Sequence, residues 1–207
     1  MGGLLTRRLF TITAGLGWPL AALLAAEVPR PAPEFVIKLT SGQQLLLSQY
    51  RGKVVALEFL STTCPHCQTC SALLERMHKE YGPRGFQPLG VAFNEMAGML
   101  VGDYIKHLQL TFPVGISERD PVLNFLQHPM IMRLLVPQLM FIDRKGIIRG
   151  QHGGEADFFK DEEKNMRAQI EALLKEPAAA RKTTPPPKGK KAASAGPASF
   201  RAPQGIQ

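Results

Sequence analysis

Metal-binding and haem-attachment patterns are incomplete in this chain. Its 207 residues contain three cysteines, with no second separate Cys-x-x-Cys pair and no His-x-x-x-His pair. A four-ligand zinc site therefore lacks its second pair of ligands, and an iron–sulfur cluster lacks its fourth cysteine. Haem attachment needs His directly after the second cysteine of a pair, but Gln68 and Ser71 occupy those positions. We predict neither a metal nor another cofactor.

A strong charge of one sign is also missing from the middle of the chain. The formal net charge is +8. Residues 176–207 contain six Lys or Arg residues and one Glu, and residues 1–30 contain three Arg residues and one Glu. Residues 31–175 hold 16 basic and 15 acidic residues. The basic character belongs to the two ends, so we expect no nucleic-acid partner for the folded part.

Residues 1–26 have the pattern of a signal peptide or an N-terminal anchor. Arg7 and Arg8 precede an apolar stretch from Leu9 to Ala26, which is the order of an export signal. Thr6-Arg7-Arg8-Leu9-Phe10 also resembles the twin-arginine export motif, so both Sec and Tat export stay open. Since about 18 residues are the lower limit for a membrane span, an uncleaved anchor is the alternative to cleavage. We expect a periplasmic or other extracytoplasmic location, with membrane association through this segment if it is retained.

The remaining segments divide into a linker, one domain and a tail. Residues 176–207 are rich in Pro, Ala, Gly and Lys, a composition that cannot bury a core, and we predict a disordered basic tail there. We interpret residues 27–34 as a linker and residues 35–175 as the folded domain. The count of 207 residues leaves room for one such domain plus its extensions.

Within residues 35–175, apolar runs alternate with amphipathic stretches and turn residues. The pattern predicts strands over 35–39, 44–47, 54–60, 86–93, 111–115, 139–143 and 146–149, helices over 65–81, 97–110 and 156–175, and an irregular region over 116–135. The first two strands form an N-terminal β-hairpin. Strands that alternate with helices predict a three-layer α/β/α domain with a mixed central sheet.

The segment Cys64-Pro65-His66-Cys67 directly follows the apolar strand 54–60. Two cysteines three positions apart at such a junction are typical of a redox dithiol. Pro65 suits the first position of a helix, which places Cys64 at the N-cap. There the helix dipole and backbone N–H groups lower a cysteine pKa from about 8.5 to roughly 3.5–7.5. We predict Cys64 as the nucleophile, His66 as a further stabiliser of its thiolate, and Cys67 as the shielded resolving thiol.

Two sets of residues carry a resemblance to known families. Residues 57–67 resemble the active-site segment of DsbA-type thiol oxidases, including an acidic residue six positions before the first cysteine. Residues 42–55 and 136–146 resemble the TlpA/ResA-like and AhpC/TSA-like thioredoxin-fold proteins, and the likeness covers about residues 35–173. The resemblance implies a thioredoxin fold and thiol–disulfide exchange with protein thiols and disulfides. It also implies an upstream membrane or thioredoxin-type redox partner.

The resemblance also assigns a role to Val136 and Pro137. It implies a cis peptide bond beside the dithiol, whereas trans is the default for an X-Pro bond without it. The backbone edge at this bond can hydrogen-bond an extended substrate chain while Cys64 attacks the disulfide of that chain. We therefore expect Val136 and Pro137 to bind substrate.

Glu58 stands inside an otherwise apolar strand, where an unpaired carboxylate is costly. We predict that it accepts the proton of Cys67, with a pKa raised by burial. The alternative is a strand-end Glu that reaches solvent or an Arg. Cys70, one turn after Cys67, is expected to be a buried apolar residue.

Two other functions and the direction of the reaction stay open. A thiol peroxidase of the peroxiredoxin type needs Pro and Thr seven and three positions before its cysteine, but Leu57 and Ser61 stand there. A metal-binding or carrier domain would use Cys64, Cys67 and Cys70. The dipeptide Pro65-His66 favours an oxidant, whereas the frame around it resembles that of reductants.

Overall fold

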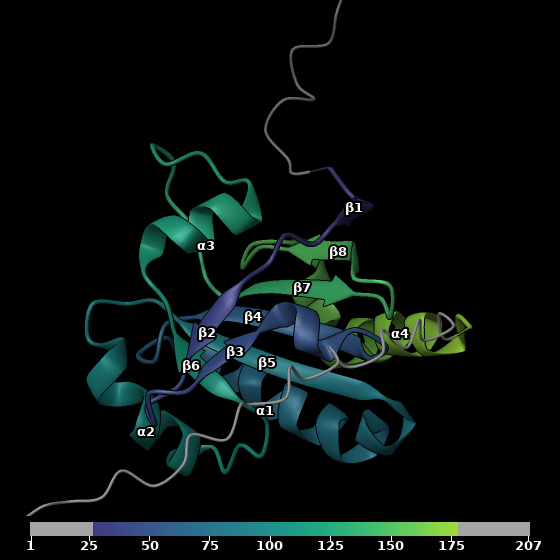
Figure 1. Ribbon diagram of the computed structural model, residues 1–207, viewed down its shortest axis with the longest axis horizontal. Helices are drawn as coiled ribbons and strands as arrows, with labels where there is room; N and C mark the ends of the chain where they lie inside the picture. The colour runs from purple at the N-terminus through teal and green to yellow at the C-terminus, as the bar shows by residue number, and fades with distance from the viewer. Residues whose placement is uncertain (1–26, 178–207) are drawn as a thin grey trace, which may run out of the picture.

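The computed structural model describes residues 27–177 as one mixed α/β unit (Figure 1). Its strands are β1 (Arg30–Pro31), β2 (Val36–Lys38), β3 (Gln44–Leu46), β4 (Val54–Leu60), β5 (Phe86–Ala92), β6 (Val114–Ile116), β7 (Gln138–Ile142) and β8 (Ile147–His152). Its α-helices are α1 (Pro65–Tyr81), α2 (Ala97–His107), α3 (Arg119–Leu126) and α4 (Glu162–Lys175). The predicted export segment, residues 1–26, and nearly all of the predicted basic tail lie outside the described residues.

All eight strands belong to one sheet, in the order β1-β8-β7-β4-β5-β6-β2-β3. The pairs β4–β5 and β5–β6 are parallel and the other pairs are antiparallel, so the sheet is mixed. The central strand β4 is buried along its whole length because helices cover both faces of the sheet. Burial on both faces explains why its sequence is a continuous apolar run and does not alternate.

Helices lie on both faces of the sheet. Buried residues of α1, α2 and α4 form one hydrophobic core with alternate residues of β4 and β7. Residues of α3 form a second core on the opposite face, where Phe125 packs edge-on against Phe35 at 5.3 Å between ring centroids. Figure 1 shows α3 above the sheet and α1 below it. These layers confirm the predicted α/β/α architecture with a mixed sheet.

The N-terminal hairpin, β2 and β3, extends the central sheet. Lys38 of β2 pairs with Ile116 of β6, next to a close approach of the two backbones at Gly115. A Cβ atom at Gly115 would lie 2.5 Å from the carbonyl oxygen of Lys38, so only glycine fits without displacing a strand. The predicted hairpin is thus confirmed, and it is attached to the sheet through β6.

Helix α3 was not expected, because the sequence predicts an irregular region over 116–135. Pro121 and the polar residues around it are typical of a loop. Pro121 is the third residue of the helix, where a missing N–H leaves no hydrogen bond unmade. The apolar residues Val122 and Phe125 then face the sheet and are buried. The prediction of an irregular region was therefore wrong for residues 119–126.

Several predicted boundaries also differ from the structure. The second long helix ends at His107 and not at residue 110, because Gln109 adopts a left-handed backbone with φ of 51°. The strand expected at 111–115 covers Val114–Ile116. The last α-helix begins at Glu162, after a 3₁₀ turn over Asp157–Asp161.

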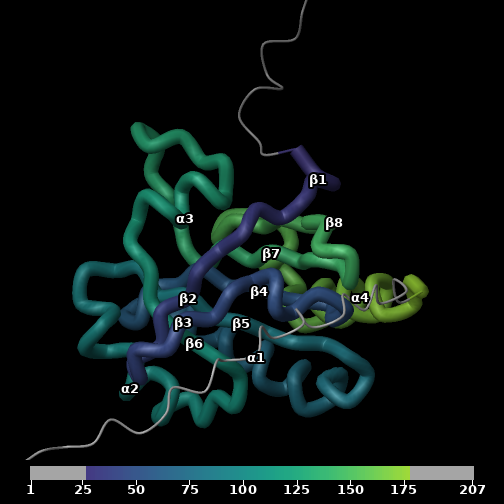
Figure 2. The backbone as a smooth tube through the Cα atoms, viewed as in Figure 1, coloured from purple at the N-terminus to yellow at the C-terminus, as the bar shows by residue number. Residues whose placement is uncertain are grey.

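Residues 30 and 31, within the stretch interpreted as a linker, form β1 and pair with β8 at one edge of the sheet. From there the chain crosses to β2, near the other edge (Figure 2). The guanidinium of Arg30 donates to the carbonyl oxygen of Phe125 at 3.2 Å and to Oε1 of Gln151 at 2.8 Å. These bonds tie β1 to both α3 and β8.

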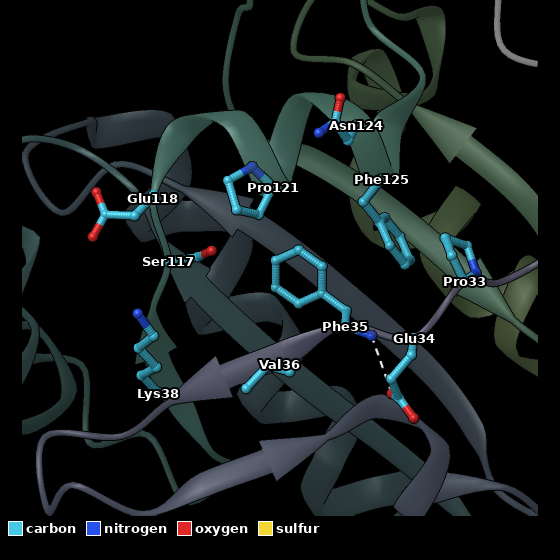
Figure 3. A pocket seen from close by; sticks show the side chains of 10 residues that line it. All are labelled: Pro33, Glu34, Phe35, Val36, Lys38, Ser117, Glu118, Pro121, Asn124 and Phe125. Atoms are coloured by element: carbon cyan, nitrogen blue, oxygen red, sulfur yellow. Dashed lines mark hydrogen bonds between the residues drawn. The ribbon is translucent and has the colours of Figure 1, made fainter.

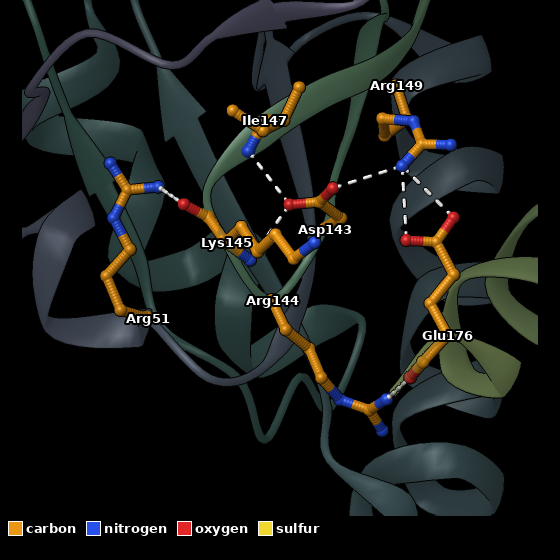
Figure 4. Close-up of polar contacts among 7 residues, drawn as sticks. All are labelled: Arg51, Asp143, Arg144, Lys145, Ile147, Arg149 and Glu176. Atoms are coloured by element: carbon orange, nitrogen blue, oxygen red, sulfur yellow. Dashed lines mark hydrogen bonds and ion pairs between the residues drawn. The ribbon is translucent and has the colours of Figure 1, made fainter. Parts of the chain in front are cut away.

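The turn between β7 and β8 is fastened to the end of α4 by charged groups (Figure 4). Arg144 donates to the carbonyl oxygens of Leu174 and Glu176, which have no partner within the helix. Arg149 lies between two carboxylates, 3.1 Å from Asp143 and 3.0 Å from Glu176. The folded unit therefore includes residue 176. Among residues 27–177, no helix has the length and apolar character needed to cross a bilayer.

Candidate active site

The dithiol lies where β4 ends and α1 begins. Pro65 is the first residue of α1, and Cys64 is its N-cap, as the sequence predicts. The sulfur of Cys64 accepts the backbone N–H of Cys67 at 3.4 Å, in place of the oxygen that usually caps a helix. The positive end of the helix dipole is thus directed at this sulfur.

The two sulfurs differ in their access to solvent. Cys64 is partly exposed, whereas Cys67 is fully buried, and all three cysteines carry free thiols. Burial raises the pKa of Cys67 strongly, and the nearby carboxyl of Glu58 raises it further. Only Cys64 can therefore meet a large partner first, and Cys67 needs a base before it can attack.

The segment before β7 reaches the dithiol from 72 residues further along the chain. The Val136–Pro137 bond is cis, which confirms the conformation that the resemblance implies. Antiparallel pairing of β7 with β4 places the carbonyl oxygen of Val136 4.0 Å from the sulfur of Cys64. The partly exposed thiol and the backbone at the cis bond are thus neighbours, and the thiol donates to that carbonyl oxygen.

A cleft of about 650 Å³ begins beside the dithiol. Its lining includes Ser61, three residues before Cys64, and Val136 at the cis bond. It continues past Asn94 and Glu118 at the carboxyl ends of β5 and β6, the usual position of a ligand site in such sheets. The cleft is therefore open to a group that has reached Cys64.

A second cavity, of about 420 Å³, lies between β2 and α3 (Figure 3). Phe35 and Phe125 line it, and it shares Ser117 and Glu118 with the cleft. The dithiol cysteines line neither hollow, but Ser61 and Val136, which lie beside Cys64, line only the cleft, so we assign the reaction to the cleft.

Glu58 lies beneath the dithiol in the middle of β4. Its side chain has no exposed surface, and Oε2 accepts the hydroxyl hydrogen of Ser71 at 2.6 Å. Burial raises the pKa of Glu58 to about 8. The alternative of a strand-end carboxylate that reaches solvent or an Arg is therefore wrong.

Two residues of this buried network were missed by the sequence analysis. The hydroxyl of Tyr104 in α2 lies 2.8 Å from Oγ of Ser71 and 3.0 Å from the carbonyl oxygen of Cys67. Ser71 could have been found from its spacing, because it stands one helical turn after Cys67. Tyr104 could not, since its partners come from another helix.

His66 faces α4 in this structure. Its Nε2 atom lies 3.9 Å from Oε2 of Glu162, and its ring meets Phe159 edge-on at 4.8 Å between centroids. Cys70 is fully buried, which confirms that expectation, and burial raises its pKa well above the ordinary value. Glu162, which the sequence analysis did not select, adjoins both Cys70 and His66. Among residues 27–177, no group of three or more His, Cys, Asp or Glu is placed to hold a metal ion.

Residues 28–151 match the model of the AhpC/TSA family. The chain belongs to the AhpC/TSA family. Within this family it is similar to the thiol-disulfide oxidoreductase ResA of Geobacillus thermodenitrificans, with 31% identity over 147 residues, which is 68% of this chain and 80% of the relative. It is also similar to the thioredoxin-like protein YneN of Bacillus subtilis, with 28% identity over 59% of this chain and 69% of that protein.

A solved structure supports the same assignment. A thiol:disulfide interchange protein of the thioredoxin family from Chlorobium tepidum superposes with a TM-score of 0.60 and 23% identity, over 72% of this chain and 99% of that chain. This likeness shows the thioredoxin fold. The AhpC/TSA-family chain described here is thus a TlpA/ResA-like thioredoxin-fold protein and a thiol–disulfide oxidoreductase.

Proposed function

We propose that this protein is an exported reductant that exchanges the Cys64–Cys67 dithiol with disulfides of protein substrates. The observation that carries the proposal is the environment of one sulfur. Cys64 is partly exposed at the positive end of α1, accepts the N–H of Cys67, and lies 4.0 Å from the carbonyl oxygen of Val136. A nucleophile, a second thiol and the backbone at the cis bond therefore meet at one point.

The reaction has two displacements. The Cys64 thiolate attacks one sulfur of a substrate disulfide, forms a mixed disulfide, and releases the other substrate sulfur as a thiolate. Cys67 then loses its proton and attacks the sulfur of Cys64. The Cys64–Cys67 disulfide forms and the second substrate sulfur leaves, so the substrate gains two electrons and the protein loses two.

Glu58 is the base that we assign to the second displacement. Burial raises the pKa of Cys67 most, and the charge of this carboxylate raises it further, so the two groups lie close enough to interact. A carboxyl with a pKa of about 8 can accept the proton of a buried thiol far better than an ordinary glutamate can. The buried position also keeps competing water away from the thiol.

Val136 and Pro137 form the substrate-binding edge in this account. The cis bond holds the carbonyl oxygen of Val136 towards Cys64, where it can accept an N–H from an extended chain. The cleft that begins at Ser61 and Val136 has room for side chains next to the substrate cysteine. No cofactor is needed for the exchange, because both electrons come from the two thiols.

The surroundings of the dithiol favour reduction of substrates over oxidation. A strongly stabilised Cys64 thiolate would stabilise the reduced form and make the pair an oxidant. Here the sulfur has a single backbone N–H partner, that of Cys67. The imidazole of His66 faces the carboxylate of Glu162 at 3.9 Å, which would offset a positive charge on the ring. The Pro-His dipeptide therefore pushes the potential upward only weakly.

The location and the division of the chain belong to the same proposal. An export segment over residues 1–26, cleaved or retained as an anchor, would deliver the domain to an extracytoplasmic compartment. A membrane or thioredoxin-type partner there would reduce the Cys64–Cys67 disulfide again. The basic residues 178–207 would form a tail outside the folded unit, which begins at β1 and ends just after α4.

Trapping of the mixed disulfide tests this function. Cys67→Ser removes the resolving thiol, so a protein disulfide substrate such as insulin should stay covalently attached to Cys64. Cys70→Ser is the matched control, because it removes a thiol one turn further along α1 and should leave turnover intact. Attachment of insulin at Cys70 would contradict the proposal. Attachment that persists when Cys64→Ser is added to Cys67→Ser would contradict it as well. Peroxide consumption by Cys64 at peroxiredoxin-like rates would favour the peroxidase alternative.

A further inference from the structure

A chain of hydrogen bonds leads away from Glu58, and the proposed reaction gives this chain no role. Oε2 of Glu58 lies 2.6 Å from Oγ of Ser71, which lies 2.8 Å from the hydroxyl of Tyr104. That hydroxyl lies 3.0 Å from the carbonyl oxygen of Cys67. The chain therefore starts at the carboxyl that we assign as the base and ends on the backbone of the residue whose thiol it deprotonates.

The oxygens of this chain are shielded from water. Glu58 and Ser71 have no exposed surface, and Tyr104 is 5% exposed. Oε1 of Glu58 is buried without a hydrogen-bond partner, so among residues 27–177 the hydroxyl of Ser71 is the one oxygen or nitrogen that hydrogen-bonds to the carboxyl. A buried carboxylate with one such donor is costly to ionise, and a base must ionise before it can act. The donor at residue 71 is therefore decisive for this base.

The two hydroxyls can point in either direction along the chain, because a hydroxyl both donates and accepts. When Glu58 is ionised, Ser71 donates to its Oε2 and Tyr104 donates to Ser71, so both hydrogens point towards the negative charge. When Glu58 is protonated, its hydrogen finds an acceptor only from Oε2, because Oε1 has no partner. The carboxyl then donates to Ser71, Ser71 donates to Tyr104, and Tyr104 donates to the carbonyl oxygen of Cys67. Every hydrogen of the chain has an acceptor in both states.

The other titratable groups around Glu58 come from three helices. They are Cys67 and Cys70 of α1, Tyr104 of α2 and Glu162 of α4. The positions that pair with Glu58 on the two flanking strands are Gly90 of β5 and Leu139 of β7, whose side chains do not ionise. None of these groups carries a positive charge in any protonation state, so hydrogen bonds must stabilise an ionised Glu58.

The pKa shifts at the two ends of the chain agree with this arrangement. Burial is the main cause that raises the pKa of Glu58 to about 8, and the hydrogen bond from Ser71 acts in the opposite direction. Burial also raises the pKa of Tyr104, and the charge of Glu58 raises it further. Tyr104 therefore keeps its hydrogen throughout the pH range in which Glu58 titrates.

We propose that Ser71 and Tyr104 are positioning residues for the exchange reaction, and that their hydroxyls form a reversible chain which stabilises Glu58 in both its ionised and its protonated form. This inference rests on the proposed function, in which Glu58 takes the proton of Cys67. One proton moves in that step, from the sulfur of Cys67 to the carboxylate. The hydroxyl hydrogens of Ser71 and Tyr104 turn without leaving their oxygens, so the chain carries no net proton and changes no oxidation state.

Titration of the Glu58 carboxyl carbon by ¹³C NMR, in the reduced, full-length protein, measures the effect of the chain. Ser71→Ala removes the donor to the ionised carboxyl, and a hydrogen bond to a charged group is stronger than one to a neutral group. We expect this variant to raise the midpoint of Glu58 by about one pH unit. Tyr104→Phe keeps the ring but weakens Ser71 as a donor, and it should raise the midpoint by about half a unit.

The double variant Ser71→Ala/Tyr104→Phe distinguishes a chain from two independent contacts. Tyr104 acts on Glu58 through Ser71, so the loss of its hydroxyl should have no further effect once the hydroxyl of Ser71 is gone. We expect the double variant to titrate within about 0.3 pH unit of Ser71→Ala. Shifts that add would overturn the chain. A Ser71→Ala midpoint equal to that of the unmodified protein would overturn it as well.

Tyr81→Phe is the matched control for Tyr104→Phe. Tyr81 is 2% exposed and is the last residue of α1, at the opposite end from the dithiol. Its hydroxyl also has a carboxylate partner, since it donates to Oε1 of Glu171 at 2.9 Å. The control should leave the midpoint of Glu58 unchanged. A shift as large as that in Tyr104→Phe would show a general effect of a lost hydroxyl and would contradict the chain.

The pH profile of Cys67 attack on a Cys64 mixed disulfide, measured in a single turnover, tests the proposed function separately. A base must be ionised, so the profile should move upward together with the midpoint of Glu58 in each variant. Shifted midpoints with an unshifted profile would support the chain and contradict Glu58 as the base. Unshifted midpoints, with a profile that still responds to Glu58→Gln, would overturn the chain and leave the function standing.

Discussion

At the scale of single residues, Glu58 links the stability of the protein to pH. Its pKa in the folded protein is about 8, above the ordinary value of 4.5. Between these values the folded state binds more protons than the unfolded state, so stability falls as pH rises. The contribution is complete below about pH 4.5 and is lost as the pH rises through about 8.

Replacing Glu58 should remove this pH dependence. We expect the free energy of unfolding of the reduced protein to fall between pH 5 and 8, by at most about 1.4 kcal/mol per pH unit. Glu58→Gln keeps the shape of the side chain and cannot ionise, so its curve should be flatter. Urea denaturation at several pH values measures both curves, with Glu163→Gln as a control for net charge. Parallel curves for Glu58→Gln and the unmodified protein would contradict the pKa and its cause.

The site residues that can be predicted from the sequence are those that stand out in a local sequence pattern. Cys64 and Cys67 stand out by their spacing, and Glu58 by its place in an apolar run. Tyr104 and Glu162 give no such signal, because their position depends on how α2 and α4 pack against α1. Only the folded chain brings these groups to the dithiol.

At the scale of secondary-structure elements, the junction between β2 and β6 is a close contact of two backbones. A Cβ atom at Gly115 would lie 2.5 Å from the carbonyl oxygen of Lys38, and backbone atoms cannot move aside as a side chain can. We expect Gly115→Ala to lower the free energy of unfolding by about 1–3 kcal/mol through overpacking. Gly102→Ala in α2 is the matched control, since nothing lies within 4 Å of its Cβ position.

The control substitution should change stability in the opposite direction. Alanine is favoured over glycine inside a helix by about 1 kcal/mol, so Gly102→Ala is expected to stabilise the protein. Denaturant titration of Gly115→Ala and Gly102→Ala under the same conditions measures both changes in the free energy of unfolding. Equal effects of the two substitutions would mean that the approach of β2 to β6 is looser than the structure describes.

The elements that the sequence predicts well are those with a strong and long pattern. The bounds of β4 and of α1 agree with the prediction at every residue, because one is a continuous apolar run and the other begins at a proline and ends before Gly82. Helix α3 was not predicted because it has only eight residues and includes Pro121. Strand β1 was not predicted because two residues are too few to show a periodic pattern. Both are held by contacts with distant parts of the chain.

At the scale of the whole molecule, β1 decides where the folded unit begins. Arg30 connects it to α3 and to β8 by hydrogen bonds of 3.2 and 2.8 Å. A chain of residues 35–177 should therefore be less stable than a chain of residues 27–177, by about 2–6 kcal/mol, because at least four hydrogen bonds to the rest of the unit are lost: two from Arg30, one from the N–H of Ala32 to Gly146, and one from the N–H of Ser48 to Glu34. Urea denaturation of the two chains tests this difference. Equal stability would show that β1 contributes nothing and that the unit begins at residue 35.

The central claim is that Cys64 and Cys67 form the redox centre of a reductant, and an equilibrium redox titration with peptide mapping tests it most directly. The account predicts one two-electron transition that joins Cys64 to Cys67, with Cys70 still a free thiol on either side of it. The midpoint should lie below about −250 mV, near the −270 mV of thioredoxin. A midpoint above about −150 mV, or a disulfide that includes Cys70, would contradict the account.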